Sequence, residues 1–534
     1  MRILLLSGLL ALASRVLADG LVTYKVIGFP DAAGNTFAVE IDKKLYPLRT
    51  SKSSFPLWSA KVANDSSLSP SYRYVQLSRR NKAVAREGFM RQLENADTTQ
   101  NEFFGREVTI TDLPPIKQVY EDVRPEPSAS VFDCSQIATM HFTVDPDEFE
   151  YMMNHPKGEK RTTIKAGFKF INANTVYSAD EVKFKVSGHH SRIYQKVSLE
   201  VKFDKSEEHP FFNQSVIKMR AEYTDPSMLR ERLYLDVLNS IGVPTSQGSY
   251  ARVYVNGKPQ GFYQMVEDIE ETMLMRTVHR GSIKDKTDLG ALYKMGHRES
   301  TLNYMGPKAT DYPELKYRNI VLGDNPEDEP MQRIIEFMKD LQDWNPKDSK
   351  GIAYWNERLD LDGFLRAMAL EYLAGAWDAF WWNGNNYFMY YNPQSKVWQF
   401  IPSDFDHTFN SGGNRLQAEA SYKTYGENGL VFNNQPLVSK LILKNKDINR
   451  KFETILSTIT EGVFNSEALE GRMKAYETQL EKEVEWDLSI DRSNLPGTNR
   501  GWTINKFHKS IWKLQSSIAR WIRNRSESVA HQFE

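Results

Sequence analysis

The chain has 534 residues and a formal net charge of −1 at pH 7, because 68 Lys and Arg oppose 69 Asp and Glu. This balance lacks the basic surplus that nucleic-acid binding requires, so we expect no nucleic-acid partner. The length is sufficient for more than one domain with a sizeable core. A single cysteine, Cys134, excludes an internal disulfide and a zinc site built from cysteines.

The N-terminal stretch MRILLLSGLLALASRVLADG combines Arg2, an apolar run at 3–13 and small residues before Asp19. This pattern predicts a secretory signal peptide over residues 1–18. No other segment has about 18 consecutive apolar residues, so an integral membrane protein is not expected. The polar C-terminal segment carries no lipid-anchor signal. We therefore expect a protein of the secretory pathway, the cell wall or the exterior. Three N-glycosylation sequons fit this route, at Asn64, Asn213 and Asn524.

Short runs of alternating polar and apolar residues fill the first part of the chain, as at 21–29 and 36–42. Such runs, separated by turn residues, predict strands. We therefore expect a small β-sandwich-like domain over residues 19–125. The polar stretch at 121–130 contains two prolines, which is typical of a linker.

The pattern then changes to that of an α+β domain, which we expect over residues 131–534 and helical from about 430 onward. Strand-like runs precede a helix predicted over 225–243, with an aspartate at its start and a glycine near its end. A hairpin is predicted over 251–268, because Asn256-Gly257 is a strong turn signal.

Residues 295–328 are rich in Gly, Pro and Asp and predict a long surface loop. Two amphipathic helices are expected on either side of residue 350, over 331–344 and 359–377. The second ends directly before Asp378. A two-stranded ribbon is then predicted over 385–404, and it brings the acidic residues at both of its ends together.

Acidic residues gather around this ribbon: Asp378 precedes it, Asp404 and Asp406 end it, and Asn383 follows Asp378 by five positions. Mg²⁺ prefers hard oxygen ligands, usually carboxylates with an amide oxygen and water. In phosphoryl transfer the protein positions such a metal on the phosphates and holds an aspartate near the attacking hydroxyl. The pattern therefore favours a metal-assisted phosphoryl-transfer site. A glycoside hydrolase, with Asp404 and Asp406 as its two carboxylates, is the alternative.

Several motifs together resemble the CotH spore-coat protein kinase family, which includes CotH-like surface proteins of Mucorales fungi. The resemblance covers most of residues 131–410. The segments that carry it are VSGHHSRIYQKVSLEVKF (186–203), KMRAEYTDPSMLRERL (218–233), VYVNGKPQGFYQMVEDIE (253–270), ALYK (291–294) and DAFWWNGNNYFMYYNPQSKVWQFIPSDFDHTF (378–409).

This resemblance implies an atypical protein-kinase-like fold with a helical C-terminal part. It implies binding of ATP with Mg²⁺ or Mn²⁺, and phosphorylation of Ser or Thr on coat, cell-surface or secretory-pathway proteins. By motif, Asp378 would be the catalytic base or an aspartate that faces the metal, and Asp404 would be a metal ligand with Asp406 beside it. The amide ligand would be Asn383 by its spacing or Asn386 by its place before a tyrosine.

The resemblance also implies residues for the nucleotide. Lys196 would contact a phosphate, with Lys202 as the rival. Arg230 would contact a phosphate or form an ion pair. Glu267 would line the nucleotide pocket, together with the backbone of residues 265–266.

Two features depart from the family pattern. The loop after Asp378 is three residues longer than usual, and Ser403 and Asn410 replace a Trp and a Gly. The alternative to a kinase is a non-catalytic surface adhesin or invasin. It would use the fold as a scaffold and bind a host receptor through the exposed loop around 295–314.

Overall fold

The computed structural model describes residues 20–64, 71–94, 97–121, 130–158, 162–188, 190–204, 211–318, 320–323, 331–412 and 418–533. The chain forms two compact units. The first comprises Met1–Thr109 with Ile171–Thr175, and the second comprises Ile110–Phe170 with Val176–Glu534. The predicted signal peptide and most of the predicted linker lie outside the described residues.

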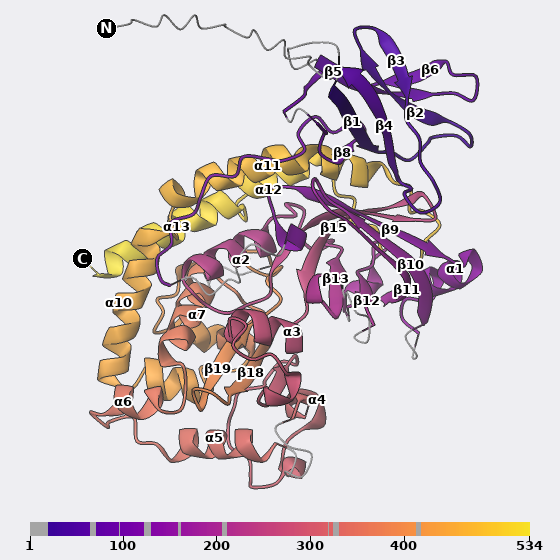
Figure 1. The fold of residues 1–534 in the computed structure, drawn as a ribbon. Helices are drawn as coiled ribbons and strands as arrows, with labels where there is room; N and C mark the ends of the chain where they lie inside the picture. Colours follow the sequence, from indigo (N-terminus) through magenta and orange to yellow (C-terminus); the bar gives the residue numbers. More distant parts are fainter. Residues whose placement is uncertain are drawn as a thin grey trace, which may run out of the picture. The chain divides into compact units, whose positions relative to one another are not determined.

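The first unit contains two β-sheets that share one hydrophobic core (Figure 1). One sheet has the strand order β4-β1-β8, and the other has the order β3-β2-β5-β6, with β7 pairing β5. Val22, Tyr24 and Val26 alternate along β1 and are almost completely buried, as expected for one face of a strand. The strands are β1 (Gly20–Ile27), β2 (Thr36–Ile41), β3 (Lys44–Pro47), β4 (Leu57–Asn64), β5 (Ser71–Leu77), β6 (Ala83–Arg86), β7 (Arg91–Gln92) and β8 (Glu102–Phe103).

Seven strands of the second unit form a closed barrel in the order β10-β11-β12-β13-β15-β14-β9. The hairpin β14–β15 turns at Asn256 and Gly257, which both have positive φ, as predicted for this dipeptide. Strand β14 pairs in parallel with β9, more than one hundred residues earlier. The strands are β9 (Ile137–Val144), β10 (Thr163–Ile171), β11 (Val176–Val186), β12 (Leu199–Lys202), β13 (Val216–Arg220), β14 (Gly248–Val255) and β15 (Lys258–Glu267).

A second sheet of this unit has the order β17-β16-β18-β19. It contains the predicted ribbon as the antiparallel pair β18–β19. The predicted long loop at 295–328 is not entirely loop, because it includes α4 and β17. The strands are β16 (Leu292–Met295), β17 (Ile320–Leu322), β18 (Tyr387–Asn392) and β19 (Val397–Pro402).

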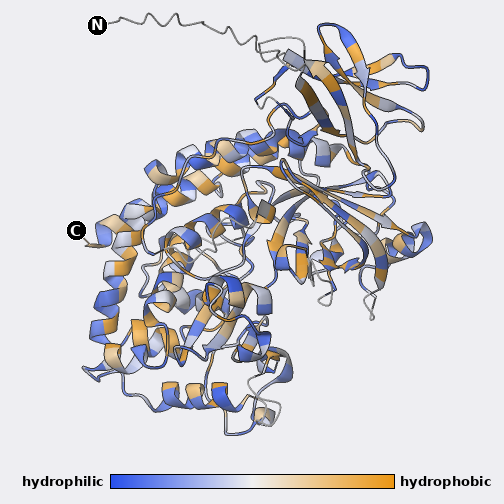
Figure 2. Ribbon diagram, viewed as in Figure 1, coloured by the Kyte–Doolittle hydropathy of each residue, from blue (hydrophilic) through white to orange (hydrophobic). Residues whose placement is uncertain are grey.

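Helices surround this sheet and form most of the C-terminal part. Hydrophobic and hydrophilic residues lie on different sides of α5 and α10 (Figure 2), and the hydrophobic side of each is buried. In the described part of the chain, no helix is both long and apolar enough to span a bilayer. The described helices are α1 (Pro146–Asn154), α2 (Arg230–Ser240), α3 (Glu271–Met273), α4 (Glu314–Tyr317), α5 (Gln332–Asp343), α6 (Gly351–Asn356), α7 (Leu361–Ala374), α8 (Phe380–Asn383), α10 (Lys446–Gly462), α11 (Ser466–Ser489), α12 (Ile504–Trp512) and α13 (Ile518–Phe533).

Aspartate side chains hold the starts of two helices, α7 and α2, that lead to the acidic residues near this sheet. The Asp360 side chain accepts the N–H of Gly363 and caps α7, whose buried core face packs against α10 and α13. Asp225 accepts the backbone N–H groups of Leu229 and Arg230 and so closes the start of α2. The prediction that Asp225 is the N-cap is wrong, because α2 begins at Arg230 and its N-cap is Leu229. Asp225 instead accepts N–H groups at the helix start from the preceding turn.

Candidate functional site

Asp378 lies just after α7, and the last turn of that helix shapes its surroundings. Gly375 ends α7 with φ 59°, a left-handed conformation. Glu371 is 1% exposed, and its Oε2 accepts the backbone N–H of Trp381 at 2.8 Å. Burial raises the pKa of Glu371 to about 8, although the N–H groups of Trp381 and Phe380 oppose this rise. Glu371 therefore holds the start of α8 near Asp378.

Three amide side chains converge on Asp378. The Nδ2 atoms of Asn383 and Asn385 each lie 3.2 Å from Asp378 Oδ1. Nδ2 of Asn386 donates to the Asp378 backbone oxygen at 2.9 Å and lies 3.3 Å from Oδ2. Arg298 Nε lies 3.4 Å from Oδ1 and forms an ion pair. Both amide residues singled out from the sequence therefore contact Asp378, and Asn385 joins them.

Asn386 also links Asp378 to the end of β19. Its backbone oxygen accepts the N–H of Ser403 at 3.0 Å, which extends the β18–β19 pairing by one step. Asp404 follows with φ 63°, a conformation that costs a residue other than glycine on the order of 1 kcal/mol. The segments that carry Asp378 and Asp404 therefore meet at Asn386.

Arg220, the last residue of β13, lies among four carboxylates. Its Nη2 lies 2.6 Å from Asp404 Oδ1 and 3.6 Å from Asp406 Oδ1. Its Nε lies 2.6 Å from Glu231 Oε2 and 3.2 Å from Glu222 Oε1. Glu231 belongs to the first turn of α2, so this guanidinium ties the barrel, a helix and the end of β19 together.

The four carboxyl groups have different pKa values, because burial and the charge of Arg220 act on each of them to a different extent. Desolvation alone would raise the pKa of Asp404, but Arg220 outweighs it and holds the pKa well below its usual range. Burial raises the pKa of Glu222 to about 7 and raises that of Glu231 well above its usual range, although Arg220 opposes both shifts. Burial also raises the pKa of Asp406, and the neighbouring Asp404 charge adds to the rise.

Two lysines extend the charged cluster along neighbouring strands. Lys218, two residues before Arg220 on β13, lies 2.7 Å from Asp268 in an ion pair. Lys294 on β16 forms no ion pair among the described residues, and its Nζ lies 5.6 Å from the centre of the Phe388 ring. Burial and the nearby Lys218 lower the pKa of Lys294, against the opposite effect of Asp268 and Asp404.

Lys196 lies in a different environment. It is 1% exposed, and its Nζ donates to the Phe262 backbone oxygen at 2.5 Å and to Asp487 Oδ2 at 3.0 Å. These contacts connect the barrel to α11. Its rival Lys202 is the exposed last residue of β12.

Arg230 and Glu267 are both committed to buried ion pairs. Arg230 pairs with Asp225, and its Nη2 donates to the Ser516 backbone oxygen at 2.9 Å. Glu267, at the end of β15, pairs with Arg276. Arg230 was expected either to contact a phosphate or to form an ion pair, and in the structure it forms the ion pair.

The residues that sequence reasoning missed lie within the quoted motifs. Arg220, Glu222 and Glu231 belong to the segment KMRAEYTDPSMLRERL, and Lys294 ends ALYK. A signal was available, because Lys218 and Arg220 are two residues apart on a strand and must share a face. Thr224, whose Oγ1 donates to Asp406 Oδ2 at 2.6 Å, gave no such signal.

The acidic cluster offers oxygen ligands of the kind that a divalent cation prefers. No three His, Cys, Asp or Glu side chains form a preassembled metal site within the described ranges. The chemistry nevertheless fits, because Asp404 and Asp406 offer hard oxygen ligands and the Asp404 side chain is 42% exposed. Four acidic side chains also share one guanidinium, and a bound cation would favour their charged forms.

Comparison with known proteins relates this chain to one protein family. A family model described as CotH kinase protein matches residues 184–529. Invasin CotH2 of Rhizopus delemar is 28% identical over 84% of this chain and 76% of its own length. Invasin CotH3 of the same fungus is 26% identical over 87% of this chain and 77% of its own length. Inner spore coat protein H of Bacillus subtilis is 24% identical over 54% of this chain and 73% of its own length.

Proposed function

Because the chain belongs to the CotH kinase family, we propose that it is a secreted protein kinase that transfers the γ-phosphate of ATP to serine or threonine hydroxyls. Membership of a kinase family implies ATP use. The observation that carries the proposal is the meeting of Asp378 and Asp404 at Asn386, beside the Arg220 cluster. Phosphoryl transfer requires this combination of a base, acidic oxygens and fixed positive charge.

Asp378 is the proposed base. It would accept the proton of the serine hydroxyl as that oxygen attacks phosphorus and the bond to ADP breaks. Three amide groups fix the Asp378 carboxylate, so little reorganisation is needed when the hydroxyl arrives. Its side chain is 18% exposed, which leaves it accessible from one side.

Asp404 and Asp406 would hold Mg²⁺ or Mn²⁺, with the amide oxygen of Asn383 or Asn386 in support. When bound, the metal would neutralise the phosphate oxygens and orient them for transfer. Lys294 is the cation that we assign to the phosphates, because it lacks a carboxylate of its own among the described residues. This assignment replaces Lys196, whose charge is used by Asp487.

The Arg220–Glu231 pair supports an atypical protein-kinase-like fold. In protein kinases, a basic residue on a central strand pairs with a glutamate of the helix that follows, and the pair must be in place for activity. Here the strand is β13, the helix is α2 and the hairpin β14–β15 comes next. The proposed substrates are serine-bearing proteins of the coat, cell surface or secretory pathway.

The test is incorporation of label from γ-labelled ATP into the protein itself and into a serine-rich acceptor, with Mg²⁺ or Mn²⁺. Asp378→Asn and Asp404→Asn should each reduce incorporation at least about a hundredfold. Asp447→Asn is the matched control, because Asp447 forms only a surface pair with Arg450. Equal labelling of all four proteins would refute the assignment, as would no labelling of the wild type with either metal.

The alternative function is that of an adhesin, and two observations favour it. Relatives are named invasins, and exposed residues at 296–299 and around Met305 flank the buried Leu302. Arg298 of this exposed stretch contacts Asp378, so a receptor bound there would cover the proposed base. Host-cell adherence that Asp378→Asn leaves intact, together with no phosphoryl transfer by the wild type, would favour the adhesin.

A further inference from the structure

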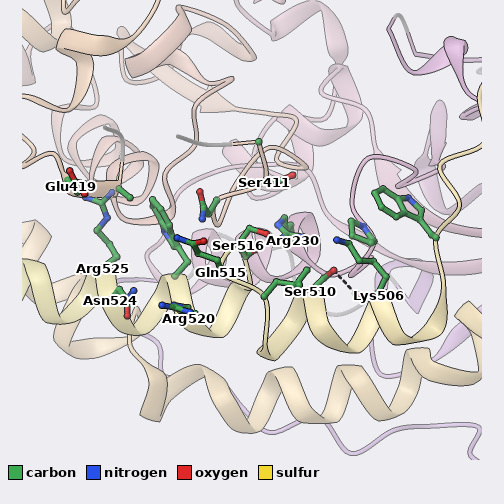
Figure 3. A pocket seen from close by; sticks show the side chains of 17 residues that line it. Arg230, Ser411, Glu419, Lys506, Ser510, Gln515, Ser516, Arg520, Asn524 and Arg525 are labelled. Carbon is green, nitrogen blue, oxygen red and sulfur yellow. Dashed lines mark hydrogen bonds between the residues drawn. The ribbon is translucent and has the colours of Figure 1, made fainter. Parts of the chain in front are cut away.

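A large cavity lies away from the Arg220 cluster, between α12, α13 and the segment after β19. Its volume is about 870 Å³, which is within the range of small-molecule sites. Figure 3 shows residues of α12 and α13 along one side and Arg230 and Ser411 opposite them. None of the carboxylates that contact Arg220 lines it, so it is separate from the proposed nucleotide site.

The charge of the lining is strongly positive. Arg230, Lys506, Arg520 and Arg525 line the cavity, and Glu419 is its only described carboxylate. Neither Lys506 nor Arg520 forms an ion pair with any residue that the structure describes. Cations that line one cavity without carboxylates of their own create a positive potential there, which favours a bound anion.

Arg230 forms a fixed positive part of the cavity wall. It is 3% exposed, and its Nη1 and Nη2 groups are used by Asp225 and Ser516. Its Nε is buried with almost no accessible surface, so this group stiffens the wall and does not itself face the ligand space. The positive charge of Arg230 therefore adds to the potential inside the cavity without a direct contact, and an anion there is favoured.

The uncharged residues that line the cavity indicate what kind of ligand it can hold. Ser411, Ser510, Ser516, Gln515 and Asn524 offer polar groups, and Trp502 and Trp521 offer flat apolar surfaces. Phosphate groups suit several basic side chains at once, and the start of the 16-residue helix α13 adds a favourable dipole. The cavity also has room for the rest of a molecule that carries the phosphate.

We propose that this cavity binds a phosphate monoester or diphosphate, with Arg520 and Lys506 as its anion contacts. The phosphate would come either from a free small compound or from a phosphoserine side chain of a protein. Ser411, at the cavity, accepts a hydrogen bond from Trp377 Nε1 through its backbone oxygen at 2.5 Å, and Trp377 precedes Asp378. Occupancy could therefore be sensed at the proposed base, but the binding itself does not depend on kinase activity.

The test is calorimetric titration of the full chain with two probes. Pyrophosphate represents the free compound, and a phosphoserine peptide, paired with its unphosphorylated form, represents the protein source. The test variant is Arg520→Ala with Lys506→Ala. The control is Arg523→Ala with Lys509→Ala, which removes the same charges from the same helices outside the cavity.

We expect at least one phosphorylated probe to bind, with the test variant weakening it at least about tenfold and the control leaving it unchanged. Binding of pyrophosphate alone identifies a free compound, and binding of the phosphopeptide alone identifies a protein. Lys294→Ala separates this site from the proposed nucleotide site, and it should leave the affinity unchanged. Loss of binding in Lys294→Ala but not in the test variant would overturn the proposal, and so would no binding of either probe or equal weakening in both double variants.

Discussion

Arg220 shows what a single residue contributes to this protein. Its guanidinium contacts Asp404, Glu222 and Glu231 from the end of one strand. Breaking a buried charge network by removing one partner typically costs about 3–5 kcal/mol, because the remaining charges stay buried. The identity of such a residue is hard to derive from sequence, since a basic residue at the end of a strand is ordinarily solvated.

The residue-scale prediction concerns Glu371, whose folded pKa of about 8 lies above its ordinary value of 4.5. Its contribution to the unfolding free energy is complete below pH 4.5 and is lost as the pH rises through about 8. Glu371→Gln should remove this part of the pH dependence of the unfolding free energy. The part due to one carboxyl group has a slope of at most about 1.4 kcal/mol per pH unit. Chemical denaturation between about pH 5 and pH 9 measures it.

The expected sign is that Glu371→Gln gains stability relative to the wild type as the pH rises. The N–H of Trp381 keeps an acceptor in the variant, so the two proteins should differ little near the acidic end. Glu357→Gln, at an exposed position, serves as the control. A wild-type-to-variant difference that stays constant across the pH range would contradict the assignment.

At the scale of elements, α7, the loop with α8, and the ribbon β18–β19 together position Asp378 and Asp404. The helix, the ribbon and the hairpin β14–β15 follow from periodicity, a capping aspartate and an Asn-Gly turn. The barrel does not, because its closure depends on β9 pairing with β14 across a long stretch of chain. Likewise, α4 and β17 arise where composition alone predicts a loop.

The element-scale prediction concerns the end of α7. A Cβ at Gly375, where φ is 59°, would lie 2.4 Å from Trp521 Cζ2. Gly375→Ala should therefore lower the unfolding free energy by about 1–3 kcal/mol and reduce label incorporation, because the loop that carries Asp378 must shift. Thermal denaturation and the labelling assay measure the two effects.

Gly501→Ala is the matched control for this substitution. Gly501 has φ 61°, but a Cβ there meets nothing within 4 Å. The control therefore carries the backbone strain without the clash against Trp521. Equal losses of stability in both variants would show that the contact with Trp521 contributes nothing.

At the scale of the whole molecule, two units have separate hydrophobic cores. The turn at Ile171–Thr175 belongs to the first unit, although it lies between two barrel strands of the second. The sequence does not reveal that this turn belongs to the first unit, because a turn with asparagines resembles any other hairpin turn. Alternation of apolar residues, in contrast, was sufficient to predict the strands β1 and β2.

Separate cores predict two thermal transitions in a calorimetric scan of the full chain. Val39→Ala, in the core of the first unit, should lower one transition temperature only. Leu370→Ala, on the buried face of α7, should lower only the other, with a cost of about 2–5 kcal/mol. Each variant is the control for its counterpart. One transition that both substitutions shift would mean that the units unfold as one.

The contacts made by Asn386 also bear on how relatives of this protein can be found. Its amide and its backbone oxygen fix the span between Asp378 and Ser403, while α8 takes up the residues in between. The length of that connection is thus free to vary while its ends stay in place. A genome survey that requires the asparagine-tyrosine pair at five positions after the aspartate would overlook chains of this type, in which Asn386 follows Asp378 by eight. A survey anchored on the asparagine-tyrosine pair at the start of β18 would retain them.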